Sequence, residues 1–243
     1  IQALFKVKDD AGKAYDLKAE LPEKIDTKPS ARKWIEACVG AKFKVDNIDV
    51  KPATRKPAPP FTTSTLQQEA SRKLGFNVKR TMSAAQKLYE SGYISYMRTD
   101  STSLSETAQQ AILAQITKEF GDKYAQPRQY ASKSANAQEA HEAIRPSYPE
   151  NPTITDGDRD MERLYDLIWK RAVASQMADA KLERTQVSIS VSAHPGEFLM
   201  AKGEVIKFDG FLKLYIENLD DEPEEEGAAI LPPLKEGQPL DLN

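Results

Sequence analysis

The sequence predicts an α+β protein in which a mainly α-helical block is inserted into a β-rich domain formed by both chain ends. Strand-type alternation of apolar and polar residues occurs before residue 51 and again after residue 184. Between these regions the pattern is helical, and helix start signals are frequent. A stretch with four prolines, 51–60, separates the first β segments from the helices. We therefore assign residues 1–56 and 182–243 to a discontinuous β domain and residues 57–181 to a helical domain.

The N-terminal part of the β domain is expected to contain a hairpin, one helix and a further strand. Segments 3–7 and 14–19 alternate on either side of a polar turn. A helix over about 30–38 begins at a serine and is followed by glycine, and the next strand covers 43–50.

The helical domain begins with three helices that share one start signal. Each has a hydroxyl residue three positions before Gln or Glu, the capping-box pattern, which predicts helices at about 64–74, 83–91 and 103–120. The first two are followed by a β element, an order typical of winged-helix modules that bind DNA. A long helix over about 158–178 has a continuous apolar stripe and is interpreted as scaffold.

The C-terminal part of the chain returns to alternation. Segments 187–191, 199–206 and 211–216 are predicted as strands, with turns at 194–196 and 209–210. Residues 218–227 are strongly acidic and are expected to form a solvated loop.

The net charge of −3 conceals a basic segment. Residues 51–100 contain nine Lys or Arg and three Asp or Glu, an excess of six. Cys38 is the only cysteine, which excludes an internal disulfide and a Cys-based zinc site. We see no secretory signal and no membrane-spanning run, and we expect a cytoplasmic protein. Because the chain begins at Ile1 within a strand pattern, we expect it to be a piece of a longer protein.

Tyr96 and Arg98 are the first candidate site residues. If residues 94–98 are extended, Ile94, Tyr96 and Arg98 share one face. Arginine has a planar fork that matches two phosphate oxygens, and a tyrosine hydroxyl beside it suits attack on a phosphodiester. Free tyrosine titrates near ~10, so such a nucleophile needs help with its proton. The alternative for these two residues is a buried strand tyrosine with a surface arginine.

His141 and Arg145 are candidates for that help. They lie on a short helix predicted over 136–145, where they share a face with Gln138. The alternative for His141 is an ordinary surface histidine, and His194 is interpreted as structural. The spacing of Asp156, Asp158 and Asp160 does not fit a calcium loop, so we interpret the last two as helix-capping residues and predict no metal site.

Three strings together resemble successive motifs of the type IA DNA topoisomerases. They are PFTTSTLQQ at 60–68, GYISYMRTDS at 92–101 and QEAHEAIRP at 138–146. The match covers roughly residues 57–181. The residue after Tyr96 is methionine, which resembles the pattern of bacterial topoisomerase I more than that of topoisomerase III. The resemblance implies that the flanking β segments form the family's arch or hinge domain.

The resemblance also implies functions for individual residues. Tyr96 would attack single-stranded DNA, form a 5′-phosphotyrosyl bond and release a 3′-hydroxyl without ATP, while Arg98 holds the phosphate. His141 and Arg145 would position DNA or assist proton transfer, and Thr99 and Ser101 would order the site loop. Residues expected to line the DNA path are Thr63, Gln67, Lys79 and Arg80.

The resemblance has a departure that limits these expectations. The family's Mg²⁺ ligands belong to a Toprim domain that precedes these motifs and has no counterpart in this chain. We therefore expect Mg²⁺ to act in the intact, monomeric enzyme and expect these 243 residues alone not to relax supercoils. The alternative is a non-catalytic winged-helix module that binds duplex DNA.

Overall fold

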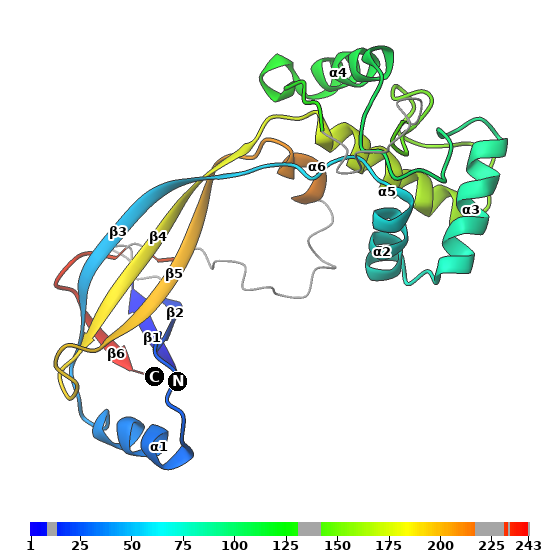
Figure 1. The fold of residues 1–243 in the computed structure, drawn as a ribbon. Helices are drawn as coiled ribbons and strands as arrows, with labels where there is room; N and C mark the ends of the chain where they lie inside the picture. Colours follow the sequence, from blue (N-terminus) through cyan, green and yellow to red (C-terminus); the bar gives the residue numbers. More distant parts are fainter. Residues whose placement is uncertain (9–13, 131–141, 217–230, 233, 243) are drawn as a thin grey trace. The chain divides into compact units, whose positions relative to one another are not determined.

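The computed structural model describes residues 1–8, 14–130, 142–216, 231–232 and 234–242, and they divide into two compact units (Figure 1). The first, which we call the barrel unit, comprises Ile1–Thr54, Lys181–Lys207 and Glu224–Asn243 as far as these ranges are described. The second, the helical unit, comprises the described residues of Arg55–Ala180 and Phe208–Pro223. The predicted assignment of 208–216 to the β domain is therefore wrong.

The barrel unit contains a closed barrel with the strand order β1-β2-β5-β4-β3-β6. Antiparallel pairing of β1 with β2 runs from Gln2 opposite Glu20 to Lys8 opposite Ala14. The strands predicted before residue 207 are present, but β3 and β4 are longer than expected, and β3 continues through Pro52, the first of the four prolines of the predicted connector. The strands are β1 Gln2–Lys8, β2 Ala14–Glu20, β3 Phe43–Arg55, β4 Ala180–Val191, β5 Phe198–Phe208 and β6 Pro239–Leu242.

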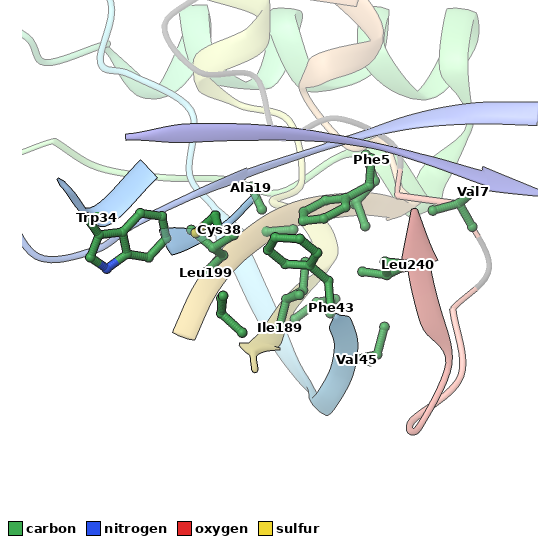
Figure 2. Packing of buried hydrophobic residues seen from close by; sticks show 14 residues of the cluster. Phe5, Val7, Ala19, Trp34, Cys38, Phe43, Val45, Ile189, Leu199 and Leu240 are labelled. Atoms are coloured by element: carbon green, nitrogen blue, oxygen red, sulfur yellow. The ribbon is translucent and has the colours of Figure 1, made fainter. Parts of the chain in front are cut away.

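The interior of the barrel is filled by alternate residues of its strands. Phe5 is fully buried and packs edge-on against Phe43, with ring centroids 5.2 Å apart (Figure 2). Helix α1, Lys28–Ala37, contributes Trp34 to this buried cluster, and Cys38, which follows directly after the helix, belongs to the cluster as well. Burial beside Glu197 raises the pKa of the Cys38 thiol. The ring of His194 stacks on the ring of Trp34, with ring centroids 4.5 Å apart, and this contact fits the interpretation of His194 as a structural residue.

The helical unit contains four of the five helices predicted within residues 57–181, with shifted starts. Asn77 caps α3 by accepting a hydrogen bond from the Arg80 N–H, so α3 begins five residues before the predicted serine signal. Asp158 caps α5 through the N–H groups of Asp160 and Met161, as predicted. The helices are α2 Thr63–Leu74, α3 Val78–Glu90, α4 Glu106–Phe120, η1 Asp122–Tyr124, α5 Arg159–Ser175 and α6 Leu212–Ile216.

Helix α6 replaces the strand predicted at 211–216. The backbone turns at Gly210, which has φ +51 and lies too close to Ala178 and Asp179 to accommodate a Cβ atom. The N–H of Lys213 then donates to the Gly210 carbonyl, which closes a helical turn. The alternation of apolar residues over so few positions does not distinguish a strand from a short helix.

Candidate active site

Segments from three distant parts of the sequence meet around Tyr96. The Ile144 N–H donates to the Phe61 carbonyl at 2.8 Å, and the Ser95 N–H donates to the Arg145 carbonyl at 2.9 Å. Segment 142–147 is thus hydrogen-bonded both to Phe61, two residues before α2, and to the chain around Tyr96. All three motif strings contribute described residues to this one place.

The segment around Tyr96 is not the regular strand that alternation predicted. Ile94 forms an isolated bridge with Pro146, and the chain bends at Ser95 and Met97. Ile94 and Met97 are buried, whereas Tyr96 is 44% exposed and Arg98 is exposed. Tyr96 and Arg98 therefore both face solvent, but the prediction that Ile94 shares their face is wrong, because side chains stop alternating where the backbone bends.

The predicted helix over 136–145 is not formed by its described residues. Residues 142–145 are non-helical, because the Ala143 and Ile144 N–H groups donate to Ser103 and Phe61 instead of to a preceding turn. Gln138 and His141 lie outside the described residues, so the face they were expected to share with Arg145 stays a prediction.

Two hydroxyl side chains fix the backbone on either side of Tyr96. The Thr63 hydroxyl accepts from the Thr99 N–H at 2.9 Å and contacts the Met97 carbonyl at 2.8 Å. The Ser95 hydroxyl donates to the Ala143 carbonyl at 2.7 Å and accepts from the Arg145 N–H at 2.9 Å. Thr63, expected to line the DNA path, is thus occupied in holding the loop.

Thr99 and Ser101 continue this loop with bonds of the same kind. The Thr99 hydroxyl accepts from the Ser101 N–H, and the Ser101 hydroxyl accepts from the Ser103 N–H, both at 3.1 Å. Ser101 is only 4% exposed, so its side chain lies within the loop. These bonds order the chain that connects Tyr96 to α4.

The side chains of Tyr96 and Arg98 are less constrained than this backbone. Among the residues that the structure describes, neither forms a side-chain hydrogen bond or an ion pair. The Tyr96 ring packs edge-on against Tyr89, with ring centroids 5.2 Å apart and an interplanar angle of 67°. The pair thus presents a solvent-facing hydroxyl and a guanidinium without a counter-ion in the described chain, groups that can attack and bind a phosphate.

Arg145 forms an ion pair with Glu142, whereas Arg98 has no such partner among the residues described. Its guanidinium donates twice to one oxygen of Glu142, at 2.9 and 2.6 Å, and once to the Pro146 carbonyl at 3.1 Å. Glu142 also accepts from the N–H of Ser105, the cap of α4. Burial opposes the charge of Glu142, but the bond from Ser105 and the charge of Arg145 outweigh it and hold the pKa of this carboxyl below its ordinary value. Glu142 belongs to the third motif string, but no sequence pattern pointed to it individually as a site residue.

The remaining predicted DNA contacts lie on α2, which contains Gln67, and on α3, which contains Lys79 and Arg80. Arg80 forms a two-point ion pair with Asp160, at 2.6 and 2.7 Å, and its guanidinium lies 4.2 Å from the centre of the Phe76 ring. Lys79 and Arg80 line a hollow of about 300 Å³ whose lining includes none of residues 92–103. Lys79 is exposed and Gln67 is half-buried.

The described residues contain no group of three or more His, Cys, Asp or Glu that could hold a metal ion. Within the same residues, no helix is both long and apolar enough to cross a membrane.

The fold and site together define a class of protein: a β-barrel unit built from separate parts of the chain, and a helical unit that presents an exposed tyrosine and an arginine without a counter-ion among the described residues. The chain belongs to the DNA topoisomerase family, which matches it over residues 1–243. The resemblance seen in the three motif strings is thereby confirmed.

Individual relatives agree with this assignment. DNA topoisomerase 1 of Streptomyces coelicolor is 51% identical over 220 residues, covering 87% of this chain and 23% of the relative. DNA topoisomerase 1 of Mycolicibacterium smegmatis is 49% identical over 213 residues, covering 83% and 23%. This chain therefore spans about a quarter of the length of these relatives.

A solved structure of full-length topoisomerase I from Thermotoga maritima matches the fold. Its TM-score is 0.73 at 29% identity, and the match covers 100% of this chain and 40% of the other. This likeness supports the type IA topoisomerase fold that the motif strings implied.

Proposed function

We propose that this chain carries the DNA-cleaving tyrosine of a bacterial type IA topoisomerase, which relaxes negatively supercoiled DNA in the cytoplasm. The observation that carries the proposal is the exposed Tyr96, followed two residues later by Arg98, which has no counter-ion in the described part of the chain, on a loop where all three family motifs meet. The intact enzyme would act as a monomer, and the barrel unit would form part of an arch whose opening allows strand passage.

The proposed reaction is a transesterification. The Tyr96 hydroxyl oxygen bonds to the phosphorus of one DNA strand and gives up its proton, while the bond from phosphorus to the 3′-oxygen breaks and that oxygen takes up a proton. A 5′-phosphotyrosyl bond and a 3′-hydroxyl result. Because one phosphodiester replaces another, the reverse reaction reseals the strand, and no ATP is needed.

Arg98 would bind the phosphate and stabilise the charge that develops on it. His141 would assist proton transfer, and the exposed Lys79 and half-buried Gln67 would contact DNA. Because Arg145, Thr63 and Ser101 have hydrogen-bonding partners within the protein, we propose that they act mainly by ordering the site.

Mg²⁺ belongs to the proposal as an ion held outside this chain. The described residues do not fit the ion, since they contain no cluster of metal-binding side chains. We accordingly propose that these 243 residues alone bind single-stranded DNA but do not relax supercoils.

The test uses the intact protein, a labelled single-stranded oligonucleotide and a denaturant that traps the covalent complex. We expect a DNA–protein adduct whose peptide map places the nucleotide on Tyr96, and no adduct with Tyr96→Phe. Equal circular dichroism spectra of both proteins would exclude misfolding. An adduct on another residue would contradict the proposal, and tighter binding of duplex than of single strands at matched salt without any adduct would favour the winged-helix alternative.

A further inference from the structure

We propose that Tyr89 is a positioning residue for Tyr96, whose ring it holds in the orientation from which the hydroxyl attacks. The inference rests on the proposed function, because it adds a second aromatic residue to the same site. Tyr89 lies in the last turn of α3 and belongs to none of the three motif strings.

The two rings form a defined contact at the surface. Their centroids lie 5.2 Å apart at an interplanar angle of 67°, an edge-to-face arrangement that aromatic pairs prefer. Tyr89 is 41% exposed and Tyr96 is 44% exposed, so neither ring is enclosed by the core. A contact between two half-exposed rings restricts orientation more than it adds to burial.

Tyr89 itself is held in place by the end of α3. The Tyr93 N–H donates to the Leu88 carbonyl and the Gly92 N–H to the Tyr89 carbonyl, each at 2.9 Å. This is a Schellman motif, with Gly92 in the left-handed conformation at φ +77. Leu88 is fully buried, which anchors the same turn in the core. The Tyr89 ring therefore projects from a rigid frame.

The Tyr96 side chain has no other directional contact in the described chain. Thr63 and Ser95 fix the backbone on both sides of it, but neither contacts the phenol through a hydrogen bond. An exposed tyrosine whose backbone alone is fixed distributes over its staggered rotamers. In-line attack needs the hydroxyl within roughly 3–3.5 Å of the phosphorus, so only part of that distribution is productive.

The expected effect follows from the size of an aromatic pair. Loss of one edge-to-face contact corresponds to a change of roughly 2- to 12-fold in the population of the held orientation. Tyr89→Leu should lower the single-turnover cleavage rate at saturating oligonucleotide by that factor without changing the dissociation constant. Tyr89→Phe should retain the wild-type rate, because it keeps the ring and no hydrogen bond of the Tyr89 hydroxyl is found in the described chain.

The experiment measures both quantities in the intact protein, with Tyr148→Leu as a matched control. Tyr148 is a tyrosine of the same unit, 58% exposed and without a ring contact to Tyr96 in the structure. In parallel, 3-fluorotyrosine at position 96 reports the ring environment by ¹⁹F NMR without DNA. We expect its resonance to shift in Tyr89→Leu and to stay in place in Tyr89→Phe and Tyr148→Leu.

The outcomes separate the two proposals. A slower reaction in Tyr89→Leu, with the shifted resonance and rescue by Tyr89→Phe, supports the inference. An unshifted resonance, or a shifted one with an unchanged cleavage rate, overturns the positioning function of Tyr89 while the proposed function stands. Cleavage that persists in Tyr96→Phe overturns the proposed function and this inference with it.

Discussion

The interior of the barrel and the loop around Tyr96 are held together in different ways. In the barrel, Phe5 is fully buried against Phe43 within a strand ladder that pairs every residue from Gln2 to Lys8. Around Tyr96 there is no ladder, and Thr63 and Ser95 fasten the backbone by side-chain hydrogen bonds.

Because of this difference, the barrel mainly determines the stability of its unit, whereas the loop bonds mainly determine the geometry around Tyr96. Apolar packing is non-directional, and many residues share it, so a barrel substitution changes mainly the free energy of unfolding. A side-chain hydrogen bond to backbone is directional, and few such bonds hold the Tyr96 loop. We therefore expect substitutions there to change the site more than the global stability.

Phe5→Ala should have the largest effect on stability. It removes a fully buried ring and should lower the free energy of unfolding of the barrel unit by about 3–5 kcal/mol. Hydrogen exchange on the intact protein should show acceleration of more than about a hundredfold at the most protected β1 and β2 amides. The amides of segment 92–103 should be unaffected.

Leu4→Ala is the matched control for this prediction, because Leu4 is the neighbour of Phe5 in β1 but is 40% exposed. It should change barrel exchange far less. Equal acceleration in both variants would mean that the burial of Phe5 is not what stabilises the barrel. Acceleration that extends to the Thr99 amide would mean that the two regions are not held independently.

Thr63→Val should have a smaller effect on stability and a larger one on the site. It keeps the β-branched shape but removes the acceptor of the Thr99 N–H and the contact with the Met97 carbonyl. Leaving such groups unsatisfied costs about 1–3 kcal/mol, so exchange at the Thr99 amide should accelerate by roughly 5- to 150-fold. Oligonucleotide cleavage should slow, because the loop that presents Tyr96 loosens.

Thr63→Ser retains the hydroxyl and should restore both properties. If Thr63→Val left the Thr99 amide as protected as in the wild type, the hydroxyl would not be the group that holds the loop.

The same contrast explains how much the sequence revealed. The barrel strands follow from alternation because each buries one side: Phe43 and Val45 are buried, while Lys44 is exposed. The strand limits were less accurate, because β3 remains paired where its residues are exposed. Helix α6 was missed because its start depends on the close approach of Gly210 to Ala178, which no local pattern reveals.

The family motifs predict which residues form the site, and that assignment stays a prediction, whereas the local geometry expected from periodicity was wrong. Family motifs identified Tyr96 and Arg98, whereas periodicity wrongly made their segment a strand and 142–145 a helix. The backbone there is paired with distant segments, so local period carries no information about it. No sequence pattern predicted a function for Tyr89, because its contact with Tyr96 depends on the Schellman turn at Gly92.

Glu142→Gln should have the smallest effect and tests whether charge contributes to fastening the loop. The ion pair with Arg145 is partly exposed, so its contribution lies within about 0–1 kcal/mol. Because the pKa of Glu142 is lowered in the folded protein, this contribution is complete above the ordinary value of 4.5 and is lost as the pH falls through the lowered one. Urea unfolding should thus show wild type more stable than Glu142→Gln at neutral pH, with the difference vanishing in acid. Glu150→Gln, at an exposed position of the same unit, should show no such convergence. A difference that persisted unchanged in acid would mean that the charge of Glu142 does not account for the difference in stability between the two proteins.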